Sequence, residues 1–550
     1  MKPAFKWNFV RIGTLAALVV ATVASPSLAG QGAVPTETIR VPGLAATAEI
    51  RVDQWGVPHL YAKSEADLFF VQGFNAARDR LFQLDLWRRR GLGQMSDAFG
   101  ADFVEQDRAA RLFLYRGDMD REWRIYSSRG TREAEPPTQR FVAGINAYID
   151  WVLANPATLP WEFRYLDYRP AKWAAEDVIR IRSHGLTRNL LSEVARAKTL
   201  CQAKDVDADQ VRFGLTNEWK AQVPVGLDPC LPAAVLQVFQ LATQEVRVVK
   251  APAKAGKAAV TVEPDWFAAL EEPPPDGSNS WVVAPWKSAT GRAIMANDPH
   301  RAYSAPSLRY LVHLSAPGLD VIGAGEPALP GISLGHNGTI AFGLTIFNID
   351  QEDLYVYELN PTDATRYRYK DDWEAFRVVK ESVAVKGGAP REIELVFTRH
   401  GPVIHTDVAK GRAYAVRSGW LEPGMSPYFG SLEYMRATDF KAFEKALVNW
   451  GAPTLKAAWE EMEKRQGPEP SFWQWGKFHY NLNEHPFATA VDDATRVRIN
   501  VGPIAKNGSE YTPNQSLQRP TDFRQMNGAS VRAVRSRAGE PSPDVPAATS

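Results

Sequence analysis

The chain has 550 residues, of which 45% are hydrophobic and 23% charged, and its formal net charge is +1. This composition is that of a globular protein long enough for a large core or several domains. The near-neutral charge gives no reason to expect a nucleic-acid partner, and the 17 Trp and 25 Phe residues suit apolar pockets.

The first 29 residues have the pattern of a cleavable export signal. Lys2, Lys6 and Arg11 form a basic start, and an apolar stretch over residues 12–24 follows them. That stretch is short for a membrane span, and Ser27-Leu28-Ala29 places small residues at a cleavage site. We therefore expect a periplasmic or secreted protein that has no membrane contact once the signal is removed. An uncleaved anchor is the alternative.

Within residues 30–245, the sequence predicts helices and two short strands. Apolar residues recur every three or four positions over residues 67–90, and the segments 141–152 and 173–200 are also expected to be helices. Before them, residues 38–41 and 48–52 alternate as strands do.

The only two cysteines, Cys201 and Cys230, fit one disulfide in an oxidising compartment, with two buried thiols as the alternative. After them, Lys, Ala, Val and Pro dominate residues 246–277 without a clear period. We interpret this segment as a linker or a removable spacer.

The pattern changes abruptly at Gly277-Ser278. The Pro-rich run 273–276 cannot supply ladder hydrogen bonds, whereas Trp281 and Val283 alternate as at the start of a strand. If the Gly277–Ser278 bond is cut, Ser278 becomes an N-terminus that carries both a hydroxyl and a free amine. An α-amino group has a pKa of about 7.7–8.0, so it can take the proton of that hydroxyl during nucleophilic attack. The dipeptide alone is common, and its meaning depends on the residues that follow.

Residues 278–530 are expected to be rich in β-strands, and residues 531–550 to form a disordered tail of Arg, Pro, Ser and Ala. Strands are expected at residues 293–296, 320–323, 339–345, 393–398 and 413–416, a turn at 297–300, and helices at 440–450 and 455–465.

Several ordered motifs then point to one family. They are Asp53–His59, Gln72–Gln83, Gly277–Trp281, Asn297–His300, Pro330-Gly331, Gly335–Gly338 and Asp350–Tyr355. Together they resemble the penicillin acylase family of N-terminal-nucleophile hydrolases, which includes acyl-homoserine-lactone acylases. The resemblance covers most of residues 38–454.

The resemblance implies an α+β fold, the Ntn-hydrolase αββα sandwich, in which two antiparallel sheets lie between helical layers. It implies a zymogen that cleaves itself at Gly277–Ser278 into an α chain, residues 30–245, and a β chain, residues 278–530. It also implies an exported hydrolase that acts on linear C–N amide bonds of small acylated substrates, an activity connected with antibiotic biosynthesis.

By the same resemblance, Ser278 corresponds to the nucleophile and its own amine to the base. The backbone N–H of Ile346 corresponds to an oxyanion-hole donor, and His300 falls beside the nucleophile. The alternative for His300 is that it closes a turn after Asp298-Pro299. That spacing gives no reason to expect a Ser-His-Asp triad.

The resemblance further implies a structural calcium ion. Asp350, Asp353 and the carbonyl of Glu352 match the family's calcium loop, and Glu193 is a remote carboxylate that could complete the set. A solvated acidic turn is the alternative reading of this loop.

The resemblance breaks after residue 454. The family continues there with Gln-Asn, and that Asn supplies the second oxyanion donor, whereas this chain continues with Leu455-Lys456. Asn449 lies on the helical side of the gap and does not take that role. A large middle block is absent, so we expect a shortened β chain and an incomplete sandwich.

Two other functions therefore remain open. One is a truncated, non-catalytic remnant of the family that binds acyl compounds. The other is an unrelated β-rich binding protein in which Gly-Ser-Asn occurs by chance.

Overall fold

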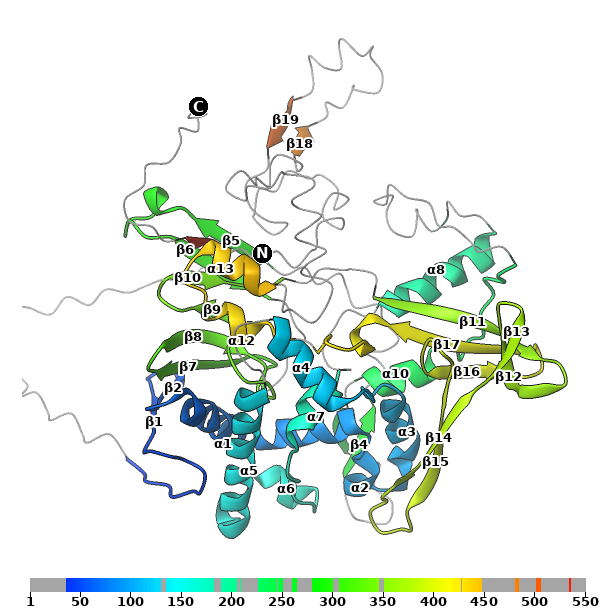
Figure 1. Ribbon diagram of the computed structural model, residues 1–550, viewed down its shortest axis with the longest axis horizontal. Helices are drawn as coiled ribbons and strands as arrows, with labels where there is room; N and C mark the ends of the chain where they lie inside the picture. The colour runs from blue at the N-terminus through cyan, green and yellow to red at the C-terminus, as the bar shows by residue number, and fades with distance from the viewer. Residues whose placement is uncertain are drawn as a thin grey trace, which may run out of the picture. The chain divides into compact units, whose positions relative to one another are not determined.

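The structure is a computed structural model, and Figure 1 shows its course. Residues 41–550 form one compact unit, which is the subject of all that follows; residues 1–40 form another. The residues expected as a first strand, 38–41, have no regular secondary structure. The structure describes residues 36–129, 135–182, 189–204, 208, 226–244, 246–250, 260–264, 279–299, 306–345, 351–426, 428–447, 480–483, 501–505 and 534–535.

A 28-residue helix, α1 (Glu65–Leu92), runs through the N-terminal part of the chain. At its start the Ser64 hydroxyl accepts a hydrogen bond from the Asp67 N–H, and at its end Gly93 adopts the left-handed conformation with φ 64°. The helix predicted over residues 67–90 is therefore confirmed.

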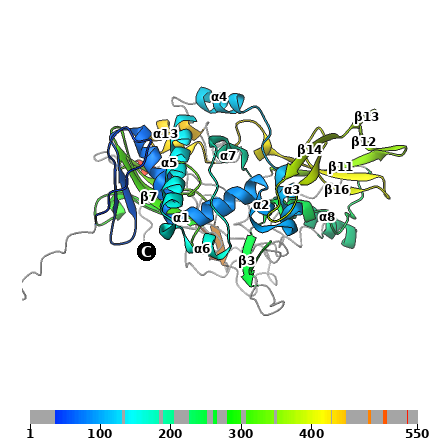
Figure 2. The same cartoon turned by 90° about the horizontal axis from the view of Figure 1, so that it is seen from below.

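Helix α1 packs against α5 (Glu135–Ala154), and both views show the two helices crossing (Figures 1 and 2). A Cβ on Gly73 would lie 1.8 Å from the Phe141 carbonyl oxygen, and a Cβ on Gly144 would lie 1.9 Å from the Phe70 carbonyl oxygen. Only glycine permits so close a backbone approach. Helix α5 includes the predicted helix 141–152.

The single helix predicted over residues 173–200 is wrong. Helix α7 (Ala175–Arg180) ends where Ile181 turns to an extended conformation, and α8 (Asn189–Ala203) begins later. Arg182 follows the break, and its guanidinium donates hydrogen bonds to the carbonyls of Ile179, Trp420 and Glu422. These partners lie mostly far away in the sequence, so the helical pattern alone could not reveal the interruption.

Short helices complete the helical part. They are α2 (Met95–Phe99), α3 (Val104–Leu112), α4 (Met119–Arg129), α6 (Trp161–Tyr165), α10 (Gln237–Thr243), α12 (Ser431–Tyr434) and α13 (Phe440–Leu447). None of the helices in the described ranges is both long enough and apolar enough to cross a membrane.

Among the described residues, the largest sheet has seven strands in the order β1-β2-β7-β8-β9-β10-β20. Strands β2 and β7 run parallel, which joins the start of the chain to residues after 300, and the other neighbours are antiparallel. The strands are β1 (Glu49–Val52), β2 (Pro58–Tyr61), β7 (Tyr310–Ala316), β8 (Leu319–Gly325), β9 (Leu334–His336), β10 (Ile340–Phe342) and β20 (Val534–Arg535).

A second group of strands packs on α3 and α10 through a shared apolar core. It contains a five-stranded sheet, β13-β12-β11-β17-β16, and the hairpin β14-β15. The strands predicted at 393–398 and 413–416 are confirmed within β15 and β17. The strands are β11 (Glu352–Asn360), β12 (Asp363–Tyr369), β13 (Asp372–Ala375), β14 (Arg377–Val383), β15 (Arg391–Phe397), β16 (Val403–Asp407) and β17 (Arg412–Ser418).

Three small antiparallel pairs remain: β3 (Val246–Lys250) with β4 (Val260–Pro264), β5 (Asn279–Val283) with β6 (Ile294–Asp298), and β18 (Tyr480–Asn483) with β19 (Val501–Ala505). The first pair lies in the segment interpreted as a linker. The predicted helix 455–465 and most of the predicted tail lie outside the described residues. Helices and several mainly antiparallel sheets together make the fold α+β, as expected.

Candidate active site

Strands β5 and β6 frame the site predicted around Ser278. Asn279, the first residue of β5, pairs in register with Asp298, the last residue of β6. Ser278 directly precedes Asn279, and His300 follows Asp298 by two residues. The described strand ends that lead to these two predicted site residues therefore lie opposite each other.

A third segment is attached to the same end of β6 through Asn297. Its side-chain amide donates to the Leu344 carbonyl oxygen at 3.0 Å, and its side-chain oxygen accepts from the Leu344 N–H at 3.0 Å. Leu344 precedes Ile346, the predicted oxyanion donor, by two residues. Asn297 was assigned to a turn from the sequence, but it lies in β6, which corrects that prediction.

Gly343 makes this attachment possible. A Cβ at this position would lie 2.4 Å from Met295 Cε and 2.7 Å from the Asn297 side-chain oxygen. Such contacts are shorter than real Cβ atoms show, so a larger residue would have to displace the end of the Met295 side chain and the Asn297 amide that binds Leu344.

The three segments that lead to Ser278, His300 and Ile346 thus converge at one end of the β5-β6 pair. Ser278, His300 and Ile346 themselves lie outside the described residues. A nucleophile with its own amine, an imidazole and a backbone N–H are the groups that acyl transfer from an amide requires.

Apolar side chains lie on the same strand pair. Trp281 on β5 is 44% exposed and Ile294 on β6 is 45% exposed. The Ser280 hydroxyl, on the face of β5 opposite to Trp281, is enclosed and has no hydrogen-bond partner among the described residues. Trp281 and Ile294 share the opposite face of the strand pair, which is apolar and exposed.

Of the predicted calcium ligands, the structure describes Glu352, Asp353 and Glu193, and Asp350 lies outside it. The Glu352 carbonyl oxygen already accepts a hydrogen bond from the Asn189 side-chain amide at 2.8 Å. The Glu352 carboxylate is buried and accepts from the Leu190 N–H at 3.0 Å and from the Trp420 indole N–H at 2.8 Å.

Asp353 is exposed at the start of β11, and Glu193 pairs with Arg196 at 3.2 Å on α8. In the part of the chain that the structure describes, no three His, Cys, Asp or Glu side chains lie close enough together to hold a metal ion. What the structure does bring together is the start of α8 and the start of β11, through Asn189, which also accepts from the Gln351 N–H at 3.0 Å.

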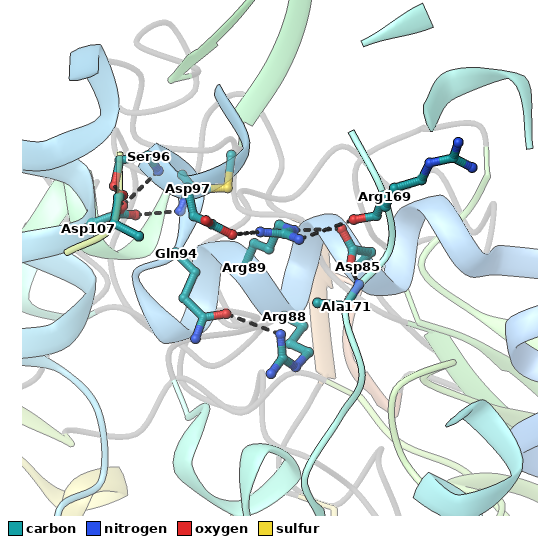
Figure 3. Close-up of polar contacts among 11 residues, drawn as sticks. Asp85, Arg88, Arg89, Gln94, Ser96, Asp97, Asp107, Arg169 and Ala171 are labelled. Atoms are coloured by element: carbon teal, nitrogen blue, oxygen red, sulfur yellow. Dashed lines mark hydrogen bonds and ion pairs between the residues drawn. The ribbon is translucent and has the colours of Figure 1, made fainter. Parts of the chain in front are cut away.

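An ionic network at the end of α1, in which Asp85 and Arg89 are buried and Asp97 is exposed, was missed from the sequence (Figure 3). Arg89 donates to the carboxylates of Asp85 and Asp97, at 2.8 Å in each case, and to the Arg169 carbonyl at 3.2 Å. Burial raises the pKa of Asp85, and the Arg89 charge opposes that rise. These ionic residues are remote in sequence from the predicted site residues. Their contacts fix α1 to the segment after α6.

Comparison with known proteins places these motifs in one family. The family profile described as penicillin amidase matches residues 47–459 and 454–543. Penicillin acylase 2 proenzyme of Pseudomonas sp. (strain SE83) is 32% identical over 70% of this chain and 48% of its own length. Acyl-homoserine lactone acylase QuiP of Pseudomonas aeruginosa is 30% identical over 68% of this chain and 42% of its own length.

The chain spans about half the length of the curated relatives it matches. A solved thermostable penicillin G acylase from Alcaligenes faecalis is 29% identical and superposes with a TM-score of 0.30 on 32% of this chain and 31% of its own, too little overlap for a comparison of folds. Since the family profile matches most of the chain, on both sides of Ser278, the chain belongs to the penicillin amidase family.

Proposed function

We propose that this protein is an N-acyl amide hydrolase that uses Ser278 as an N-terminal nucleophile. The observation that carries the proposal is the convergence of three described segments, at Asn279, Asp298 and Leu344, on one end of the β5-β6 pair. The relatives support the substrate class, because their names describe a penicillin acylase and an acyl-homoserine lactone acylase. Both names indicate removal of an acyl group, and we extend this to an acylated amide here.

Maturation comes first in this mechanism. The Ser278 hydroxyl attacks the Gly277 carbonyl, the peptide bond is exchanged for an ester, and water then opens the ester. The products are a carboxylate on Gly277 and a free amine on Ser278. Gly277 favours the step because glycine allows the backbone to bend sharply.

Turnover uses the new amine as the general base. It takes the proton of its own hydroxyl while the oxygen attacks the substrate carbonyl, and it returns the proton to the departing nitrogen. The Ile346 N–H donates to the oxyanion, and His300 stands beside the nucleophile. Water then hydrolyses the acyl ester and releases the acid.

Cleavage would leave an α chain and a β chain, which we expect to stay together in an αββα sandwich. Contacts across the proposed cleavage site support this. The Gln72 side chain exchanges two buried hydrogen bonds with the backbone of Gly331, both at 3.0 Å. Arg436 forms a bidentate ion pair with the Glu65 carboxylate, at 2.7 and 2.8 Å.

Export to the periplasm or the medium is part of the proposal. The Cys201–Cys230 disulfide supports it, because such bonds persist in oxidising compartments.

We also propose a structural calcium ion held by Asp350, Asp353, the Glu352 carbonyl and Glu193. The attachment of α8 to β11 through Asn189 supports this donor set, because it brings the helix of Glu193 to the strand of Asp353. The Glu352 carbonyl oxygen keeps a second lone pair for a metal beside the hydrogen bond that it accepts.

One observation favours the alternative of a non-catalytic remnant. The family profile matches in two pieces that meet at residues 454–459, where the sequence lacks the Gln-Asn of the family. Loss of one oxyanion donor can cost about 10²–10³ in rate.

Intact-mass analysis of the purified chain, before and after treatment with phenylmethanesulfonyl fluoride, separates the two functions. The hydrolase should appear as two chains, with one sulfonyl group on a fragment that begins at Ser278. The Ser278→Ala variant should stay uncleaved and unlabelled. An uncleaved, unlabelled wild type would support the remnant.

A further inference from the structure

We infer that Asn297 is a positioning residue that fixes the Leu344–Ile346 segment, and hence the oxyanion donor, against the Ser278 end of β5. The inference rests on the proposed function. It assigns to the side chain of a β6 residue a role that its position in the sequence does not reveal.

The contacts of Asn297 are reciprocal. Its amide N–H donates to the Leu344 carbonyl, and its amide oxygen accepts from the Leu344 N–H, both at 3.0 Å. A side-chain amide donates and accepts through neighbouring atoms, as a backbone amide does, so it imitates a strand partner for a segment that β6 does not pair with directly. Leu344 is buried and Asn297 is half-buried, so water competes little for these bonds.

The same residue belongs to the β5-β6 ladder. Asn297 pairs in register with Ser280, and its neighbour Asp298 pairs with Asn279. The backbone of Asn297 is therefore fixed to the strand that Ser278 precedes, while its side chain is fixed to Leu344, in the segment after β10 that leads to Ile346. A shift of this one side chain would change the distance between nucleophile and oxyanion donor, and a misplacement of about 1 Å can cost about 10²-fold in rate.

A purely structural role for Asn297 makes a different prediction, and Asn337 provides the matched control. The Asn337 side chain also both donates to and accepts from backbone groups. It donates to the carbonyls of Met435 and Ala437 and accepts from the N–H groups of Thr339 and Ile340. Asn297→Ala removes the two hydrogen bonds to Leu344 and Asn337→Ala removes four, but of the two side chains only that of Asn297 contacts the segment before Ile346.

The experiment measures self-cleavage and the second-order rate of labelling by phenylmethanesulfonyl fluoride, together with the urea midpoint. Asn297→Ala should slow labelling about 10- to 100-fold relative to Asn337→Ala, although Asn337→Ala removes more hydrogen bonds and should cost at least as much stability. Equal labelling rates in the two variants would overturn the inference.

Asn297→Asp adds a second readout. A carboxylate accepts from the Leu344 N–H but repels the Leu344 carbonyl, whereas a protonated carboxyl can both donate and accept. The ratio of variant to wild-type labelling should therefore rise as the pH falls, and a ratio independent of pH would contradict positioning by this side chain. A wild type that neither cleaves itself nor reacts would instead refute the proposed function, and the inference with it.

Discussion

Arg182 and Glu122 form an ion pair in which neither side chain has any exposed surface. Arg182 also donates to the carbonyls of Trp420 and Glu422, and Glu122 accepts from the Gly424 N–H at 2.9 Å. The pair therefore ties α4 and the end of α7 to residues 420–424, across the proposed cleavage site.

Removal of one member of this pair should be costly. Glu122→Gln would leave the Arg182 charge enclosed without a counter-charge, and we expect a loss of about 3–5 kcal/mol in the free energy of unfolding. Asp150→Asn is the control, because Asp150 and Lys172 form an ion pair in which both side chains are 55% exposed, and its loss should cost under about 1 kcal/mol. Urea unfolding of both variants measures the difference, and similar losses would refute the role given to Arg182 and Glu122.

The disulfide should contribute to stability. Cys201 and Cys230 are bonded across a sequence separation of 29 residues, which confirms the pairing expected from the sequence. A loop of this size is worth about 3–4 kcal/mol through restriction of the unfolded chain. The double variant Cys201→Ser, Cys230→Ser should therefore lose about 3–4 kcal/mol of unfolding free energy, seen as a lower urea midpoint. Reductant should lower the midpoint of the wild type but leave that of the double variant unchanged.

Alkaline pH should destabilise the fold through its buried tyrosines. Burial raises the pKa of Tyr115 and of Tyr357 to about 12, and it raises the pKa of Tyr434 well above its usual value. In the unfolded chain a tyrosine ionises near pH 10, so above that pH the unfolded state loses protons that the folded state keeps. The free energy of unfolding should therefore be insensitive to these groups below about pH 9 and fall between about pH 10 and 12.

Two measurements check this expectation. Phenolate absorbance of the buried tyrosines should rise together with unfolding rather than before it. Tyr434→Phe should make the fall of stability with pH less steep, because it removes a phenol that is fully buried. If the unfolding free energy of Tyr434→Phe falls with pH as steeply as that of the wild type, the buried Tyr434 phenol is not a cause of the alkaline destabilisation.

Removal of the proposed calcium ion should act through the segment at the start of β11. Chelation should lower the thermal unfolding midpoint of the wild type, because bound metal stabilises the folded state by mass action. Asp353→Asn should lose most of that response. Glu358→Gln, on an exposed position of the same strand, should keep it. Metal analysis of the purified protein gives the stoichiometry, and a wild type that is indifferent to chelation would refute the site.

Several features follow from the sequence by itself. The apolar period over residues 67–90 is local, and it predicts α1 because a helix needs only neighbours three and four positions away. The motifs around Ser278 identify the family, since their order along the chain is itself the signal. The strand after Ser278 and the strand near Asp320 were also predicted from alternation, which is again a local property.

Other features were decided only when distant segments met. The break after Arg180 depends on carbonyls at residues 420 and 422, and the parallel pairing of His59 with His313 joins strands that no short pattern relates. Asn297 shows the same limit within the candidate site. Its residue type suggested a turn, but Asn297 lies in β6 and forms two hydrogen bonds to Leu344, 47 positions away. A side-chain amide can bind local or distant backbone groups, so its partners depend on which segments the fold brings close.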